Sequence, residues 1–333
     1  MFKLLEETFR RLRYRLPNRP RQVQIEITNR CNMDCPMCPR EVLDIELEHM
    51  DWDKFVAVVA SLHGDEQITL TGWGEPFLHP RCFDMISHCK ARGHSVMITS
   101  NALFSKPELA QEIIASGVDT LTFSLDDVNG SAEMGHHNEK VLANIETVAQ
   151  LRQNGKPALR LQATLHADCE KDLLDVIKYA GRLGIQTVNV GRLDRKYAPE
   201  LRRPTALQEA KTFANADALA RSLGVQLDWL QFSVSSGLTR FFYQLLRKKL
   251  HRSGKFCLKT FDYVYITREG SVTPCCLLPH APMGNILTAD LQRIWKSGDF
   301  NHFRQNYRDV CGTCDLWTIE QVQPNEESQP HTS

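Results

Sequence analysis

The sequence predicts an α/β fold in which repeated strand–helix units build a parallel sheet with helices outside it. Two observations predict this class. Strand-like and helix-like runs alternate from residue 22 to about residue 225, and a glycine follows most of the helix-like runs as a stop signal. Six such units in series imply a parallel sheet, and six is fewer than the eight strands of a closed barrel. On pattern alone, a doubly wound sheet is an alternative.

Each strand-like run is short and bounded by Gly, Asn or Asp, and many of them are rich in β-branched residues. These runs are residues 23–28, 68–71, 95–99, 120–125, 159–165 and 187–190. The helix-like runs between and after them are residues 51–62, 81–92, 107–116, 138–153, 170–183 and 206–222. The glycines that end helices are Gly93, Gly117, Gly155, Gly184 and Gly224.

Composition excludes several classes of protein. The 333 residues include 40 basic and 40 acidic ones, so no overall charge favours nucleic acid. No apolar run approaches the ~20 residues that span a bilayer, so we expect no transmembrane segment. The N-terminus shows no secretory signal, and we expect a cytoplasmic protein. In a reducing compartment, the 11 cysteines are more often metal ligands than disulfides.

The first group of cysteines lies on a short loop after the first strand. Cys31, Cys35 and Cys38 have the spacing C-x3-C-x2-C, and three thiolates this close can ligate three irons of a four-iron cluster. The fourth iron then has no protein ligand nearby, which leaves an open position for a reactant. A structural zinc knuckle is the alternative, although zinc sites usually use C-x2-C pairs.

At these residues the chain resembles the radical S-adenosylmethionine (radical SAM) superfamily. The segment Ile27-Thr28-Asn29-Arg30, followed by the three cysteines, is similar to the opening of that family. The resemblance implies a partial (β/α)6 TIM-like barrel and a four-iron–four-sulfur (4Fe-4S) cluster. In the family the unique iron chelates SAM, and an electron from the cluster releases a 5′-deoxyadenosyl radical that abstracts a substrate hydrogen atom. A flavodoxin or a ferredoxin-type protein is the implied electron donor.

Polar residues at the ends of the next strands extend the resemblance. Thr71-Gly72-Trp73-Gly74-Glu75-Pro76 resembles the family's Gly-Gly-Glu-Pro motif, which holds the SAM amino group. Residues 99–102 resemble the strand end near the SAM ribose, and residues 124–126 resemble the Ser-x-Asp motif near the carboxylate and ribose. The implied SAM contacts are Met37, where the family often has an aromatic residue, and Gly72, Gly74, Glu75, Asn101, Ser124 and Asp126.

Two further SAM or substrate contacts come from polar residues on later strands. Arg160, Gln162 and Thr164 alternate onto one face of a strand that should be buried on both faces. Of these we select Gln162. Arg192 can bring a guanidinium to a carboxylate, and a surface salt bridge is equally compatible with its position.

The second group of cysteines closes the chain. A β-hairpin predicted over 263–273 places Cys275 and Cys276 near Cys257, and Cys311 and Cys314 form a final C-x2-C pair. Four thiolates suit either one zinc or one four-iron cluster. Gly270-x3-Pro274-Cys275 and Met283-Gly284-Asn285-Ile286 resemble the SPASM/twitch extension of radical SAM enzymes. The resemblance implies one auxiliary 4Fe-4S cluster, whose ligands would be Cys257, Cys275, Cys311 and Cys314, with Cys276 able to replace Cys275.

These assignments divide the chain into five parts. We expect a basic N-terminal helix over 1–21, a radical SAM partial barrel over 22–230 and a helical linker over 231–256. A SPASM/twitch domain with a β-hairpin and a helix then covers 257–318, and residues 319–333 form a disordered tail. Cys82, Cys89 and Cys169 stand apart from both groups, and we expect them to be small buried residues.

The function that follows is that of a radical SAM enzyme of oxidoreductase or maturase type. The auxiliary cluster would accept an electron or position the substrate. We favour oxidation or rearrangement of a small molecule or cofactor precursor, with modification of a peptide or partner enzyme as the alternative. A third hypothesis is a non-catalytic regulatory protein that binds zinc or a cluster. A base is expected for the substrate radical, and the candidates are Asp126, Asp228 and Asp262.

Overall fold

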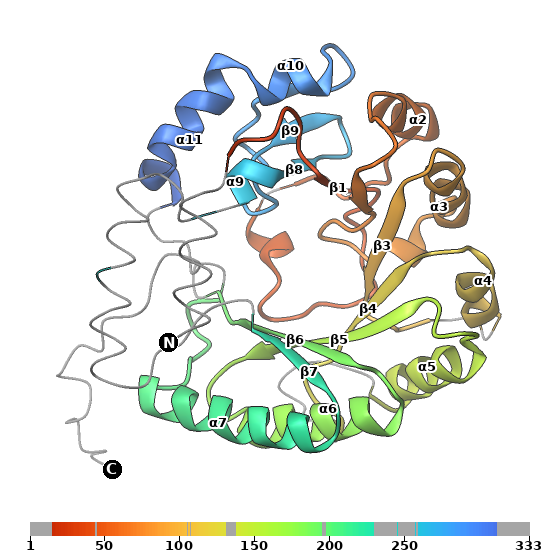
Figure 1. Cartoon of the computed structure of the whole chain (residues 1–333), viewed down its shortest axis with the longest axis vertical. Helices are drawn as coiled ribbons and strands as arrows, with labels where there is room; N and C mark the ends of the chain where they lie inside the picture. The colour runs from red at the N-terminus through yellow and green to blue at the C-terminus, as the bar shows by residue number, and fades with distance from the viewer. Residues whose placement is uncertain are drawn as a thin grey trace.

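The fold is built around one mixed sheet with strand order β10-β9-β8-β1-β2-β3-β4-β5-β6-β7. It is seen in a computed structural model, which describes residues 15–43, 45–104, 106, 108–130, 138–194, 198–229, 245, 257 and 259–311. In Figure 1 the sheet curves, and helices α2 to α7 follow its outer side. This arrangement confirms the α/β class with a parallel, barrel-like sheet.

The parallel part of the sheet follows the chain in order. Its strands are β1 (Gln22–Ile25), β2 (Gln67–Thr69), β3 (Ser95–Ser100), β4 (Thr120–Ser124), β5 (Ala158–Leu165), β6 (Thr187–Arg192) and β7 (Gln226–Trp229). Each pairs in parallel with the next. The helices between them are α2 (Trp52–Ala60), α3 (Cys82–Ala91), α4 (Leu109–Ala115), α5 (Asn138–Leu151), α6 (Glu170–Arg182) and α7 (Ala206–Ser222). Two 3₁₀ turns, η1 (Pro39–Val42) and η2 (Pro76–Leu78), lie in the loops after β1 and β2.

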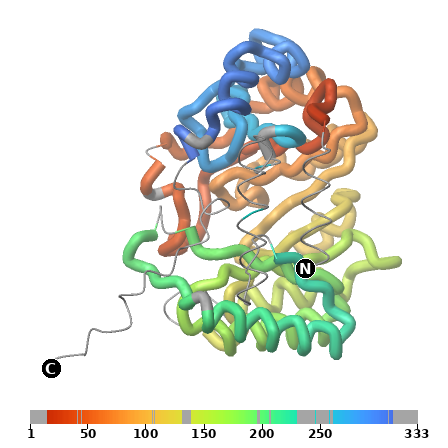
Figure 2. Tube along the Cα trace, turned by 60° about the vertical axis from the view of Figure 1, so that its left-hand side comes forward, coloured from red at the N-terminus to blue at the C-terminus, as the bar shows by residue number. Residues whose placement is uncertain are grey.

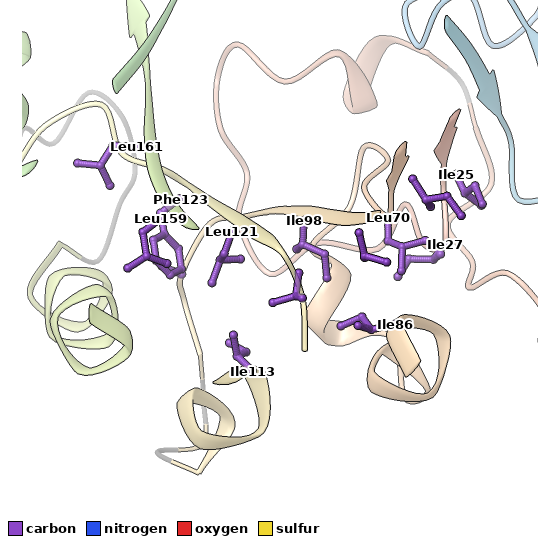
Figure 3. Close-up of a cluster of buried hydrophobic side chains, with 14 of the residues drawn as sticks. Ile25, Ile27, Leu70, Ile86, Ile98, Ile113, Leu121, Phe123, Leu159 and Leu161 are labelled. Atoms are coloured by element: carbon purple, nitrogen blue, oxygen red, sulfur yellow. The ribbon is translucent and has the colours of Figure 1, made fainter. Parts of the chain in front are cut away.

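The apolar core lies between the sheet and these helices. In β5 buried and half-buried residues alternate, so Leu159 and Leu161 face the helices while Arg160, Gln162 and Thr164 face the inside of the curve. Figure 3 shows Ile98 and Leu121 of the sheet on the same side as Ile86 of α3 and Ile113 of α4. The inner face of the parallel strands is therefore left to polar side chains, as the alternation in β5 predicted.

The C-terminal segment extends the same sheet. Helix α9 (Lys259–Asp262) leads into β8 (Tyr263–Ile266), which pairs antiparallel with β9 (Ser271–Thr273) as the predicted hairpin. The two-residue strand β10 (Gly284–Asn285) pairs with β9, and helices α10 (Leu291–Trp295) and α11 (Gly298–Cys311) follow. In Figures 1 and 2 this segment, drawn in blue, lies beside the first strand–helix unit, drawn in red and orange.

Two strand pairings were not predicted. Strand β7 adds a seventh parallel strand, and β8 pairs in parallel with β1. The four residues of β7 show only a weak alternation, so they carry little sequence signal. The docking of β8 on β1 joins residues about 240 positions apart, as in the Tyr265–Glu26 contact, and no local pattern encodes such a pairing.

Several predictions fall outside the described residues. They are residues 1–14 of the predicted N-terminal helix, the helical linker 231–256 apart from Leu245, Cys314 and the tail 319–333. Among the residues that are described, no helix is long and apolar enough to span a membrane.

Candidate active site

The cysteine loop begins at Cys31, six residues after β1 ends, and is anchored by the segment that follows it. The Asn29 side chain donates to the Glu46 carbonyl at 2.7 Å and accepts the Glu48 amide at 2.7 Å. Thr28 pairs with His49 in an isolated antiparallel bridge. Residues 45–49 therefore fix the exit of the first strand, and with it the start of the loop.

The three thiols of this loop lie within electrostatic reach of one another. Burial raises the pKa of Cys35 most, and with the charges of the neighbouring Cys38 and Cys31 that pKa reaches about 12. The Cys38 amide donates to the Cys35 carbonyl at 2.9 Å, which closes the turn between them. Three thiolates this close repel one another unless a metal centre compensates their charge, so this donor set fits an iron–sulfur cluster.

A single metal ion would need a tighter arrangement. Within the described part of the chain, no three His, Cys, Asp or Glu side chains are grouped so as to hold one ion. In a four-iron cluster each thiolate binds a different iron, so its ligands need not converge on one point. Met37 lies half-buried just before Cys38, at the position predicted for an adenine contact.

The loop after β2 packs directly on the residues that precede the cysteines. A Cβ on Gly74 would stand 2.4 Å from the Arg30 carbonyl oxygen, and one on Gly72 would stand 2.3 Å from Cγ of Glu26. The Glu75 amide donates to the Arg30 carbonyl at 2.9 Å. Only glycine allows this approach, which explains why residues 72 and 74 lack side chains.

Glu75 is an acid buried among neutral donors. Its side chain accepts the Ser100 hydroxyl at 2.9 Å and the amides of Phe77 and Asn101 at 3.2 and 2.7 Å. The residue is 3% exposed. Burial raises its pKa to about 7, although these hydrogen bonds favour the charged form. A buried carboxylate with no cationic side chain among these partners provides a favourable site for an ammonium group.

The end of β3 contacts the cysteine loop. The Asn101 side-chain amide lies 3.6 Å from the Cys31 sulfur and donates to the Asn32 side chain at 2.9 Å. Its own oxygen accepts the Leu103 amide at 2.8 Å, which fixes the orientation of the side chain. The structure therefore brings the predicted ribose contact and the first cysteine together.

The ends of β4 to β7 place a row of polar residues on the inner face. The strand register aligns Ser124 with Gln162, Gln162 with Asn189, and Asn189 with Asp228. Just beyond this row, Asp126 accepts the Thr164 amide at 2.6 Å. The Asp126 carboxylate is also close enough to Cys35 to raise the pKa of that thiol.

Two predicted site residues, Arg192 and Asp262, are held by other side chains of the protein. Arg192 forms an ion pair with Glu209 at 2.6 Å, and both side chains are only about a tenth exposed, at 9% and 10%. This is the salt-bridge alternative, although it is buried and not on the surface. Asp262 pairs with Arg21 at 2.8 Å and precedes β8, at the opposite strand end from the cysteine loop. It lies away from the other candidates for the base.

Glu26 was not among the predicted site residues, and the structure places it directly after β1, between the 71–75 loop and Tyr265 of β8. This acid is buried and accepts the Tyr265 hydroxyl at 2.6 Å and the Trp73 amide at 3.3 Å. Burial raises its pKa, and the Tyr265 hydrogen bond partly offsets that rise. An acid inside an apolar strand-like run, Val23 to Ile27, is the sequence signal that could have identified it.

The second group of cysteines is only partly described. Cys257 and Cys311 both pack against a small apolar cluster formed by Phe303 and Tyr307, so the start and end of the segment meet there. Leu278 joins the same cluster, and its amide donates to the Cys275 carbonyl at 3.0 Å. Cys257 and Cys311, and Cys275 through its contact with Leu278, therefore lie near the same apolar cluster, which is compatible with a shared iron–sulfur cluster.

The Cys276 side chain is directed toward the sheet. A hydrogen bond links it to the Tyr263 hydroxyl, where burial raises the tyrosine pKa and the thiol raises it further. Cys82, Cys89 and Cys169 are buried in the main core, as predicted.

Comparison with known proteins gives two matches to protein families. The model of the radical SAM superfamily matches residues 25–193. The model of SPASM, described as an iron–sulfur cluster-binding domain, matches residues 257–315.

Three characterised relatives differ in how much they share with the chain. The tungsten-containing aldehyde ferredoxin oxidoreductase cofactor-modifying protein of Pyrococcus furiosus is 28% identical over 179 residues, 51% of this chain and 50% of the relative. This chain therefore matches only half of that relative. The PqqA peptide cyclase of Xanthomonas campestris is 27% identical over 315 residues, 89% of this chain and 79% of the relative. The AdoMet-dependent heme synthase of Methanosarcina barkeri is 23% identical over 329 residues, 90% of each.

A solved structure supports the fold. The crystal structure of Streptococcus suis SuiB bound to S-adenosylmethionine superposes with a TM-score of 0.71 at 14% identity, covering 95% of this chain and 75% of SuiB. The two family matches imply a 4Fe-4S cluster, SAM and auxiliary iron–sulfur binding as the cofactors of an enzyme. The chain belongs to the radical SAM superfamily and carries a C-terminal SPASM domain.

Proposed function

We propose that the chain uses SAM-derived radical chemistry to modify a peptide. One observation carries the proposal: the match to the PqqA peptide cyclase extends over 315 residues and so includes both the radical SAM and the SPASM regions. SuiB, whose fold the chain shares, has also been solved bound to its precursor peptide SuiA. The alternative from the sequence analysis, modification of a peptide, thus becomes the first candidate.

In this proposal Cys31, Cys35 and Cys38 hold the 4Fe-4S cluster. When bound, the cluster and SAM supply one-electron cleavage of the sulfonium, which yields a 5′-deoxyadenosyl radical able to abstract hydrogen from a substrate. The electron would come from a flavodoxin or a ferredoxin-type protein.

The residues of the chain itself bind and orient SAM. Glu75 provides a buried carboxylate for the SAM amino group, and the backbone at Gly72 and Gly74 lets the ligand approach closely. The other proposed contacts are Met37, Asn101, Ser124, Asp126 and Gln162. Arg192 acts on SAM only indirectly, because Glu209 already holds its guanidinium.

Two acids on the inner face are candidates for the base that receives a substrate proton. Asp126 lies beside the cysteine loop, and Asp228 lies in the register row that contains Ser124 and Gln162. The auxiliary cluster, with Cys257, Cys275, Cys311 and Cys314 as its proposed ligands, would accept the electron or position the substrate. Asp262 is not a candidate for this base, because Arg21 pairs with it at the strand ends opposite the cysteine loop.

A small molecule or cofactor precursor is the second candidate substrate. The match to the AdoMet-dependent heme synthase covers 90% of both chains, which is the largest share of both chains among the relatives described above. The two candidates share the SAM site and differ only in the donor of the hydrogen atom.

The first experiment tests the class of reaction. Anaerobically reconstituted protein is reduced with dithionite in the presence of SAM, and 5′-deoxyadenosine is measured by chromatography. We expect its release from the wild type and none from Cys35→Ala. Cys169→Ala is a matched control, since it removes a thiol that is buried in the core. Release from Cys35→Ala, or none from the wild type, would contradict the proposal.

The second experiment separates the substrate classes. Extract from cells grown in deuterated medium supplies the hydrogen donor, and deuterium in 5′-deoxyadenosine reports on abstraction. If the substrate is a peptide, treating the extract with protease removes the transfer. Transfer that survives protease and passes a filter for small molecules would favour the cofactor precursor.

A further inference from the structure

Two hydrogen-bond routes join the 71–75 loop to Cys276. In the first, the Trp73 indole donates to the Cys276 carbonyl at 3.2 Å, although the two residues stand 203 positions apart. In the second, the Gln24 side chain donates to the Thr71 carbonyl at 2.7 Å and accepts the Tyr263 hydroxyl at 2.7 Å. Because Tyr263 also hydrogen-bonds with the Cys276 side chain, both routes end on the same residue.

Glu26 adds further contacts between the loop and the sheet. Its carboxylate accepts the Trp73 amide and the Tyr265 hydroxyl, so it links the loop to β8 as well. The side chain of Glu26 fills the space in which a Cβ of residue 72 would stand. Glu26, Tyr263 and Tyr265 are buried, and breaking hydrogen bonds among buried groups leaves unpaired polar atoms, at a cost of about 1–3 kcal/mol each.

Cys276 is therefore held by the barrel from two sides, through its carbonyl and through its thiol. It directly follows Cys275, a proposed ligand of the auxiliary cluster. The loop at the other end of both routes contains Glu75, the proposed partner of the SAM amino group. A change in the backbone at 275–276 cannot occur without straining contacts of the SAM loop.

We propose that these contacts couple SAM binding to loading of the auxiliary cluster, with Cys276 as a linking residue and not a ligand. The inference rests on the proposed function, because it assigns SAM to the 71–75 loop and a cluster to Cys275. A cluster bound at Cys275 fixes Cys276, and Cys276 then holds the loop in the conformation that binds SAM. By thermodynamic linkage, SAM must tighten the auxiliary site by the same factor.

A double-mutant cycle tests the coupling. The dissociation constant of SAM is measured anaerobically in the wild type, Trp73→Phe, Cys311→Ala and the double variant, with Cys257→Ala as a second way to remove the auxiliary cluster. Loss of that cluster should weaken SAM binding by about two- to tenfold when Trp73 is present, from the usual net value of a hydrogen bond. The same loss should weaken SAM binding clearly less when residue 73 is Phe, because only the route through Gln24 and Tyr263 then remains.

Trp229→Phe is the matched control, because its half-buried indole also donates a hydrogen bond, to Asp217 at 3.1 Å, on the outer side of β7. It should leave the coupling unchanged. A second readout is the electron paramagnetic resonance spectrum of the auxiliary cluster, which should change on SAM addition in the wild type and change less in Trp73→Phe. Cys276→Ser should keep the full iron content of the auxiliary site.

Each outcome discriminates. Equal SAM affinity with and without the auxiliary cluster would overturn the coupling, and so would additive effects of Trp73→Phe and Cys311→Ala. Loss of iron from Cys276→Ser would show that Cys276 is a ligand of the auxiliary cluster. If the wild type releases 5′-deoxyadenosine while the cycle is additive, only this inference fails; if it releases none, the proposed function fails first.

Discussion

The side-chain carboxylate of Glu75 accepts the backbone amide of Asn101 at 2.7 Å, so the loop after β2 and the end of β3 share one buried acid. The side-chain amide of the same Asn101 lies 3.6 Å from the Cys31 sulfur. Protonation of Glu75 therefore acts at the point where the SAM loop and the cysteine loop meet.

The first prediction is that SAM binding weakens as the pH falls below about 7. Burial raises the Glu75 pKa to about 7 in the free protein, and only the carboxylate attracts an ammonium group. The dissociation constant should therefore rise as the pH falls from 8 to 6, and Glu75→Gln should bind weakly at every pH. Isothermal calorimetry across this range checks it, and an equally steep pH dependence in Glu75→Gln would assign the titration to another group.

The same shift has a consequence for stability. Because the folded pKa lies above the ordinary value of 4.5, the folded state of the SAM-free protein binds more protons than the unfolded state. The contribution of Glu75 to stability is thus fully present below about pH 4.5 and is lost as the pH rises through about 7. Glu75→Gln should remove this loss, and denaturant titrations at pH 6 and 8 measure it.

The second prediction concerns the glycines of the same loop. Gly74→Ala places a Cβ 2.4 Å from the Arg30 carbonyl oxygen, which is backbone and cannot move aside cheaply. If this strain falls on the conformation that binds SAM, we expect SAM binding to weaken by about five- to 150-fold, since overpacking costs about 1–3 kcal/mol. Gly298→Ala is the control, because nothing lies within 4 Å of its added Cβ. Unchanged SAM affinity in Gly74→Ala would show that the loop tolerates displacement.

The sequence predicted the parallel units well because their signals are local. Each predicted helix from 51 to 222 appears within a few residues of its expected range, since apolar periodicity and glycine stops lie within the segment itself. Asn101 lies at Cys31, as expected of side chains at the carboxyl ends of parallel strands, which share one edge of the sheet.

The pairing of strands far apart in the chain, and the partners of individual charged side chains, could not be predicted from the sequence. Arg192 was assigned to a ligand or a surface pair, and only the fold shows Glu209 beside it. Glu26 was passed over because its role depends on Tyr265, which the docking of β8 on β1 brings near. Such contacts leave no periodic pattern in a single sequence, so they cannot be predicted from it.

The third prediction is the iron content. If each cysteine group holds one four-iron cluster, reconstituted wild type should contain about eight irons per chain and the Cys31/Cys35/Cys38→Ala triple variant about four. Iron and sulfide analysis, with zinc measured in parallel, checks the count. Stoichiometric zinc with little iron would instead support the zinc-binding regulatory hypothesis.

The fourth prediction is that Arg192 stabilises the fold more than it binds SAM. Removing one partner of a buried ion pair leaves an uncompensated charge and costs about 3–5 kcal/mol. Glu209→Gln should therefore lower the free energy of unfolding, while Arg192→Met with Glu209→Gln should recover part of the loss. The double variant should bind SAM with little change. A large loss of SAM affinity in that variant would show that Arg192 contacts SAM.

The last prediction separates the auxiliary site from the rest of the fold. Phe303 and Phe300 lie on the same helix, α11, and both are buried, yet Phe303 packs in the cluster with Cys257 and Cys311 whereas Phe300 belongs to the main core. Truncation to Ala leaves a cavity at either position and costs about 3–5 kcal/mol. Only Phe303→Ala should also misplace the two cysteines, so folded Phe303→Ala should lose about four irons and Phe300→Ala should keep them. Both variants should still release 5′-deoxyadenosine, because neither residue contacts the first cysteine group; equal iron loss in the two would mean that the stability of α11, and not the cluster around Phe303, controls the auxiliary site.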